Sequence, residues 1–85
     1  MNITRSEIIE VLKKNISETL DDVDVSSLDT SQTMKQIGAN SLDIVEIISR
    51  TMRQLKVKIP RAELGKLENI DALIDLIEEK ANAAA

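Results

Sequence analysis

Apolar residues recur along most of the chain at the spacing of amphipathic helices. At the start, Thr4-x-x-Glu7 has the pattern of a capping box, and Ile3 and Ile8 stand at the positions of a hydrophobic staple. Apolar side chains then repeat every three or four residues up to Leu20, which predicts a helix of about four turns. Its buried stripe consists of Ile8, Ile9, Leu12, Ile16 and Leu20.

The helical pattern stops over residues 21–33, where the sequence is acidic and rich in hydroxyl groups. We expect a long loop here, held to the core by Val23, Val25 and Leu28. A loop of this length in a small domain indicates either a function or an additional short element.

The acidic residues of this loop have some features of a calcium-binding loop. Asp22, Asp24 and Ser26 have the ligand spacing of an EF-hand. The sixth position would be Ser27 where an EF-hand needs glycine, and the twelfth would be Thr33 where it needs glutamate. We therefore expect no metal site.

A second helix is predicted after Gly38, for which we expect a positive φ. Asn40 or Ser41 is the natural N-cap, and the helix extends to about Leu55.

The rest of the chain predicts one short and one longer helix. Pro60 fits the first position of a helical turn over residues 61–64, which Gly65 ends. The last helix starts near Asn69, and its buried positions are Ile70, Leu73, Ile74 and Ile77. The apolar alternation over residues 55–59 is too brief for a convincing strand. The fold class is thus all-α: a small four-helix bundle with three main helices, one short helix and a long loop after the first. We expect one domain over residues 1–80 and a flexible tail over 81–85.

The second helix is not a plain amphipathic helix. On a helical wheel its core face holds Ile44, Ile47, Ile48, Thr51 and Leu55. Its opposite, solvated face holds Asp43, Glu46, Arg50 and Arg53. Leu42 also lies away from the core, with Val45 and Met52 at the margin, so an apolar strip runs along the exposed side beside Ser41. Single exposed apolar residues are normal, and the alternative is a docking surface for a partner protein.

Composition excludes several classes of function. The 85 residues include no His, no Cys and no aromatic residue. A thiolate, the commonest metal ligands and any ring for stacking on a base are therefore missing, which argues against a self-contained enzyme and predicts no catalytic residue. There is no signal peptide and no apolar run that could cross a membrane, so we expect a cytoplasmic protein without a membrane partner.

Charge is distributed unevenly along the chain, whose formal net charge is −4. Residues 1–49 carry four basic and nine acidic groups, residues 50–66 six and one, and residues 67–85 one and five. The basic segment is either a solvated face, a partner contact or a helix-turn-helix that binds DNA. The acidic balance elsewhere disfavours nucleic acid as a partner.

The sequence Gly38-Ala39-Asn40-Ser41-Leu42 resembles the attachment motif of the acyl and peptidyl carrier proteins, whose usual form is Gly-x-Asp-Ser-Leu. The similarity extends to the helix order, the long first loop, Val45-Glu46-Ile47-Ile48 and Ile59-Pro60. It covers about residues 3–80, the expected carrier domain.

The resemblance implies that Ser41 carries a covalent 4′-phosphopantetheine arm. A separate Mg²⁺-dependent phosphopantetheinyl transferase would supply it from coenzyme A. The terminal thiol of the arm would hold acyl groups as thioesters, so the chain itself would not be an enzyme. Partner enzymes would bind the apolar strip and the acidic residues of the second helix, that is Leu42, Val45, Met52, Asp43 and Glu46.

Departures from the family pattern indicate specialised partners. Asn40 replaces the usual aspartate, Ser49 occupies a position that is often methionine, and Arg50 and Arg53 make the end of the helix basic. We therefore include both arginines among the partner-recognition residues. The pattern favours a carrier of polyketide biosynthesis. The G-A-N-S sequence resembles donor carriers of β-branching cassettes, which present acetyl groups to a hydroxymethylglutaryl-CoA-synthase-like enzyme.

Three classes of function thus stay open: an acyl carrier, a peptidyl carrier of nonribosomal peptide synthesis, and a helical adaptor without a prosthetic group. For the carrier, the expected partners are the transferase and an acyltransferase, a ketosynthase or a hydroxymethylglutaryl-CoA-synthase-like enzyme. We expect a monomer, and the start at Met1 favours a free-standing protein.

Overall fold

The computed structural model describes residues 3–65 and 67–83. Within these residues the chain forms helices and no strand, which confirms the predicted all-α four-helix bundle. The elements in chain order are α1 (Arg5–Thr19), a short 3₁₀ helix η1 (Val25–Ser27), α2 (Ser41–Leu55), α3 (Arg61–Leu64) and α4 (Ile70–Ala83).

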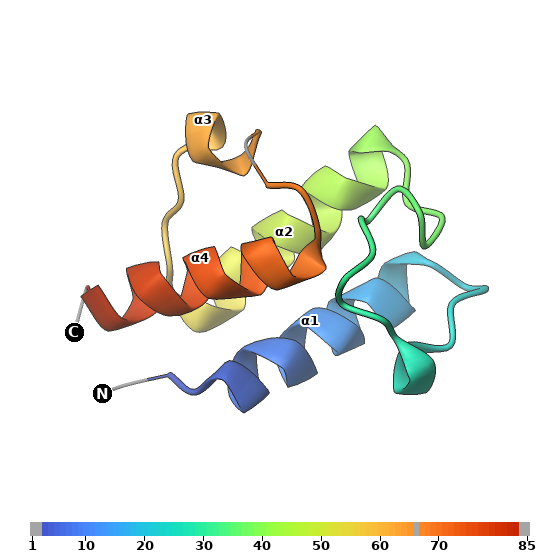
Figure 1. Ribbon diagram of the computed structural model, residues 1–85, viewed down its shortest axis with the longest axis horizontal. Helices are drawn as coiled ribbons and strands as arrows, with labels where there is room; N and C mark the ends of the chain where they lie inside the picture. The colour runs from blue at the N-terminus through green and yellow to red at the C-terminus, as the bar shows by residue number, and fades with distance from the viewer. Residues whose placement is uncertain (1–2, 66, 84–85) are drawn as a thin grey trace.

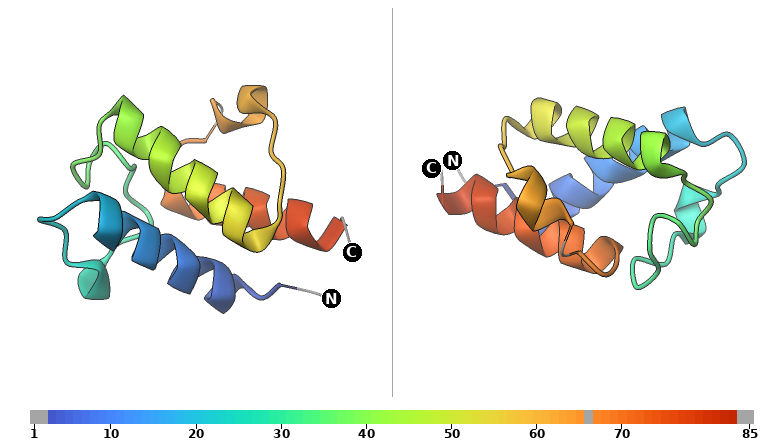
Figure 2. Two further views of the ribbon diagram at one scale, coloured as in Figure 1. Left: turned by 180° about the vertical axis from the view of Figure 1, so that it is seen from behind. Right: turned by 90° about the horizontal axis from the view of Figure 1, so that it is seen from above.

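The three long helices lie lengthwise beside one another, and α1 packs against both α2 and α4. The chain direction in α1 is opposite to that in α2 and α4 (Figure 1). The short helix α3 lies across the space between α2 and α4, as the view from above in Figure 2 shows. The start of the described chain meets its end, because the amide of Ile3 donates to Asn82 Oδ1 at 3.1 Å.

The core is aliphatic and is built mainly from the predicted stripes. The apolar side chains with the least exposed surface come from α1, α2 and α4, and burial of each contributes about 1.5–3 kcal/mol. Ile9, Leu20, Ile44 and Leu55 are only partly buried and pack against this centre. The fully buried apolar residues are Ile8, Leu12, Ile16, Ile47, Ile70, Ile74 and Ile77.

The capping box predicted for α1 is present, and Asn69, near which the last helix was predicted to start, caps α4. Thr4 Oγ1 accepts from the amide of Glu7 at 3.2 Å, and Glu7 Oε2 accepts from the amide of Thr4 at 3.3 Å. Asn69 Oδ1 accepts from the amide of Ala72 at 2.8 Å. These local bonds satisfy amides that a helix start leaves without partners, and so fix where each helix begins.

The last helix runs past residue 80, where the sequence predicted the start of the tail. Helix α4 continues to Ala83, and its Ala81 is buried one turn beyond Ile77 on the same stripe. Alanine has the highest helix propensity and its methyl group fits against the core, so the helix extends past the expected start of the tail. Residues 84 and 85 lie outside the described residues.

The long loop contains two similar turns and the 3₁₀ helix η1, which is the additional short element that the length of the loop indicated as one of two alternatives. Asp24 Oδ1 accepts from the amide and the hydroxyl of Ser26, at 3.0 and 2.5 Å. Asp29 Oδ1 accepts in the same way from Ser31, at 2.9 and 2.6 Å. As predicted, apolar residues of the loop pack against the core, namely Val23, Val25 and Leu28.

These turns predict that the stability of the loop depends on the ionisation of Asp24 and Asp29. The hydroxyl and then the amide of Ser26 hold the pKa of Asp24 below its ordinary value. A lowered folded pKa means that the turn adds stability above the unfolded pKa and loses it as the pH falls through the folded pKa. Ser26→Ala should therefore raise the pKa of Asp24, measured by NMR titration of the carboxyl carbon. Asp29, held down by Ser31, is the internal control and should not change. An unaltered Asp24 titration in the variant would contradict this account.

Candidate functional site

The turn that leads into α2 begins with a second capping box. The amide of Thr33 donates to Gln36 Oε1 at 2.8 Å, and the amide of Gln36 donates to Thr33 Oγ1 at 3.0 Å. The pattern Thr-x-x-Gln was a signal for this turn that our sequence analysis missed. It holds one helical turn just before the site.

Gly38 ends this turn in the way its position predicted. Its φ is +106°, a backbone conformation that favours glycine. Its amide donates to the carbonyl oxygen of Lys35 at 3.1 Å, and the amide of Ala39 donates to that of Met34 at 3.0 Å. This pair of bonds is a Schellman motif. A Cβ added at Gly38 would meet nothing within 4 Å, so the backbone conformation, not the available space, explains the glycine.

Asn40, and not Ser41, is the N-cap of α2. Asn40 Oδ1 accepts from the amide of Asp43 at 2.8 Å, and Asp43 Oδ2 accepts from the amide of Asn40 at 3.2 Å. The amide of Ile44 donates to the carbonyl oxygen of Asn40. Among the described residues, the amides of Ser41 and Leu42 and the hydroxyl of Ser41 make no hydrogen bond.

Ser41 therefore presents an exposed hydroxyl in the first turn of α2, beside two unused amides. Helix N-termini favour anions, because free N–H groups and the positive end of the helix dipole point toward them. A phosphodiester on Ser41 would meet this environment. The residues present thus fit a phosphate-linked group attached through the hydroxyl of Ser41.

The apolar strip predicted along α2 is divided in the structure. Leu42 is 81% exposed and Val45 is 52% exposed, whereas Met52 is half-buried and packs against the core. Val45 and Met52 line a common hollow facing α3, and Leu42 stands apart from it next to Ser41.

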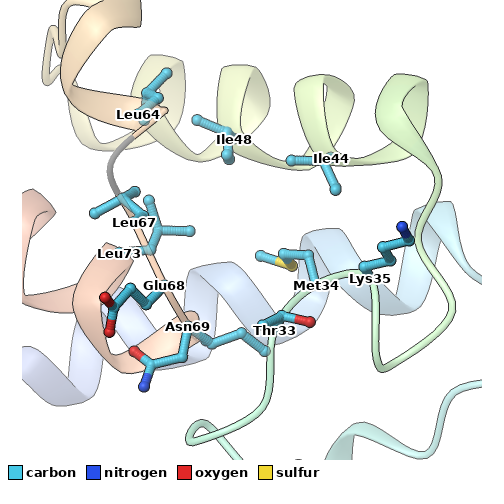
Figure 3. A pocket seen from close by; sticks show the side chains of 11 residues that line it. Thr33, Met34, Lys35, Ile44, Ile48, Leu64, Leu67, Glu68, Asn69 and Leu73 are labelled. Carbon is cyan, nitrogen blue, oxygen red and sulfur yellow. The ribbon is translucent and has the colours of Figure 1, made fainter.

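Two apolar hollows lie beside α2, and Leu64 of α3 lines both of them. The first has a volume of about 230 Å³, and Figure 3 shows Ile44 and Ile48 pointing into it from α2, opposite Met34. The second, of about 440 Å³, shares Ile44, Ile48 and Leu64 with the first. Ile44, which lines both hollows, lies one turn of α2 from Ser41.

The charged residues on α2 do not form one uniform group. Arg50 Nε donates to Glu46 Oε1 at 2.9 Å, and its Nη1 donates to Glu18 Oε2 of α1 at 3.2 Å. Arg50 is half-buried in this bridge, whereas Arg53 is exposed and forms no ion pair among the described residues. The two arginines that the sequence suggested as equivalent partner contacts therefore differ in their availability.

In residues 3–65 and 67–83, no cluster of His, Cys, Asp or Glu has the arrangement of a metal site. Within the same residues no helix is both long enough and apolar enough to cross a membrane.

An aliphatic bundle with an exposed serine hydroxyl in the first turn of α2, and without a thiol of its own, fits a carrier type of protein, in which the reactive group is attached rather than built from side chains. The family described as "Phosphopantetheine attachment site" matches residues 8–77, and the chain belongs to this family, that of the acyl carrier proteins.

Several relatives are similar over nearly their whole length. A polyketide biosynthesis acyl-carrier protein, AcpK of Bacillus subtilis, is 35% identical over 80 residues, which cover 94% of this chain and 98% of the relative. An acyl carrier protein of Thermotoga maritima is 29% identical, with 91% and 95% covered. The anthracycline acyl carrier protein DpsG of Streptomyces peucetius is 27% identical, with 98% and 96% covered.

Membership establishes the nature of the cofactor, a covalently attached 4′-phosphopantetheine group, which excludes the adaptor without a prosthetic group. The family acts with a phosphopantetheinyl transferase and with biosynthetic enzymes, and has no catalytic activity of its own.

Proposed function

We propose that Ser41 is the residue that carries the 4′-phosphopantetheine arm, and that the protein presents acyl thioesters on this arm to partner enzymes. The observation that carries the proposal is the exposed hydroxyl of Ser41 next to the unused amides of the α2 N-terminus. The arm supplies the thiol that the chain lacks.

The surrounding residues have separate roles in this proposal. Gly38 turns the chain so that the hydroxyl of Ser41 faces outward. Asn40 caps the helix with its own side chain, which leaves that hydroxyl free. The first-turn amides stabilise the charge of the phosphodiester. Leu42 and Val45 provide apolar contacts for the transferase and the later enzymes, and Asp43 adds a negative charge near the arm.

We further propose a role in polyketide biosynthesis. The similarity to AcpK and DpsG, both named for pathways of this kind, supports this role. The three relatives named above are acyl carriers, which favours an acyl over a peptidyl cargo. An acetyl-donor carrier for β-branching is the finer proposal, and it depends on the G-A-N-S sequence alone.

The partners would then be the transferase and an acyltransferase, a ketosynthase or a hydroxymethylglutaryl-CoA-synthase-like enzyme. Their proposed contacts are the exposed apolar residues of α2, then Asp43, Glu46 and Arg53, with Met52 and Arg50 less accessible than the rest. The monomeric state and the cytoplasmic location stay predictions.

A loading experiment tests the attachment site. The wild-type chain is incubated with coenzyme A, Mg²⁺ and a promiscuous phosphopantetheinyl transferase, and its intact mass is measured. We expect the mass of one phosphopantetheine group to be added, with fragmentation spectra that place it on Ser41. Absence of the gain, or a gain on another serine, would reject the proposed site.

Leu42→Asp should weaken recognition without weakening the fold. A leucine that a partner buries contributes about 1.5–3 kcal/mol, so KM for the transferase should rise by at least about tenfold. The melting temperature should not change, because Leu42 is largely exposed. Ser17→Asp, which places the same charge at an exposed position of α1, is the control and should load normally. Equal kinetics for both variants would exclude Leu42 as a contact.

A further inference from the structure

Three exposed basic side chains gather where α2 ends. Arg53 lies in the last turn of the helix, and Lys56 follows as its C-cap with a φ of +58°. In the extended segment after it, Val57 and Ile59 are buried while Lys58 is exposed. The alternation directs Lys56 and Lys58 away from the core.

These charges are not used within the part of the fold that the structure describes. Arg53, Lys56 and Lys58 form no ion pair there. By contrast, Arg50 bridges to Glu18 and Glu46. Lys80 Nζ of α4 likewise lies 3.2 Å from Glu63 Oε2 of α3, although without the alignment of a hydrogen bond. Favourable interaction with the helix dipole accounts for basic residues in or next to the last turn, but Lys58 lies beyond it.

Arg53 lies on the same side of α2 as Leu42, the exposed apolar residue next to Ser41. Leu42, Glu46, Ser49 and Arg53 are separated by four, three and four positions, so they follow one line along the outward side of α2. Eleven residues of helix span about 16 Å. An enzyme that contacts Leu42 and extends along α2 will therefore reach Arg53.

We propose that Arg53, Lys56 and Lys58 form a second docking site, which binds an acidic surface of a carrier-dependent enzyme. The inference rests on the proposed function, because the enzyme must place the entrance of its active site next to the arm on Ser41. The acidic surface of the enzyme should then lie about 16 Å from that entrance. On the line from Leu42 to Arg53, the charge of Glu46 is compensated by Arg50. The uncompensated charge therefore lies at Arg53. This asymmetry orients the enzyme along α2.

The test reverses two of these charges. The double variant Arg53→Glu, Lys56→Glu is compared with Lys13→Glu, Lys14→Glu, which changes the net charge equally on α1. The probe is an acyltransferase or ketosynthase that turns over the wild-type acylated protein. The α2 variant should raise KM by about tenfold, with little change in kcat. Added salt should raise KM for the wild type and much less for this variant.

Binding of the same enzyme to a Ser41→Ala chain, with and without the charge reversals, separates this proposal from the attachment site. If the wild-type chain is not loaded at Ser41 but the charge reversals still weaken binding of the enzyme, the docking site is supported and the attachment site is rejected. An unchanged KM and an unchanged dissociation constant in the α2 variant would overturn the docking site. An equal effect of the α1 control would also overturn it, because total charge would then be responsible.

Discussion

Ser41→Ala should abolish loading completely while leaving the fold intact. The variant lacks the only atom through which we expect the arm to attach, so its mass should not change after incubation with coenzyme A, Mg²⁺ and the transferase. Asn40, not Ser41, caps α2, and the side chain of Ser41 is exposed. The free energy of unfolding should therefore stay within about 0.5 kcal/mol of the wild type. Intact-mass spectrometry and urea unfolding measure the two effects separately.

The chain offers two matched controls for this variant. Ser6 is exposed in the first turn of α1, inside the capping box of Thr4 and Glu7, just as Ser41 lies inside the box of Asn40 and Asp43. Ser49 is half-exposed on the outward line of α2. Ser6→Ala and Ser49→Ala should both load like the wild type, because neither serine follows the Gly38 turn or adjoins Leu42. A residual mass gain in Ser41→Ala, or its loss in either control, would contradict the assignment.

The features of this site that could be predicted are those set by short stretches of sequence. Gly38 takes the positive φ expected of it, and the exposure of Leu42 follows from its angle on α2. Asn40 as the cap was one of two open alternatives, and the structure resolves it through a bond to an amide three residues away. Helix starts are predictable because their caps are local.

Contacts between distant parts of the chain could not be predicted in this way. Arg50 reaches Glu18, which lies 32 positions earlier, so the wheel of α2 alone placed it with the free charges. We expected α4 to end before Ala81, although Ala81 continues the stripe of Ile77, because the alanine-rich end of the chain gave no sign that it packs on the core. Both depend on how α1, α2 and α4 pack together.

Another such contact joins α1 to α2 through a buried side-chain amide. Asn15 has no exposed surface, and its Nδ2 donates to Thr51 Oγ1 at 2.9 Å and to Gln54 Oε1 at 3.0 Å. Thr51 in turn donates to the carbonyl oxygen of Ile47 at 2.8 Å. Asn15 Oδ1 is buried without a partner among the described residues. A polar residue on the apolar stripe of α1 thus fixes which positions of the two helices face each other.

Asn15→Asp should be among the most destabilising single changes in this chain. It removes both donors, and places a negative charge beside two acceptor oxygens in the core. An uncompensated buried charge costs about 3–5 kcal/mol, a large share of the roughly 4–13 kcal/mol that holds a domain of this size folded. Burial raises the pKa of the new carboxyl, so the penalty is present above that folded pKa and shrinks as the pH falls through it. Urea unfolding at pH 7 and pH 5 should show the recovery.

Asn15→Leu separates the charge from the loss of the two hydrogen bonds. Leucine has a similar size, carries no charge and removes the unpaired oxygen, while Thr51 keeps its bond to Ile47 and Gln54 can turn to water. The free energy of unfolding should fall by only about 1 kcal/mol, equally at both pH values. If the two variants lost the same stability at pH 7 and neither recovered at pH 5, burial of charge would not be the cause. The hydrogen bonds of Asn15 would then account for the whole loss.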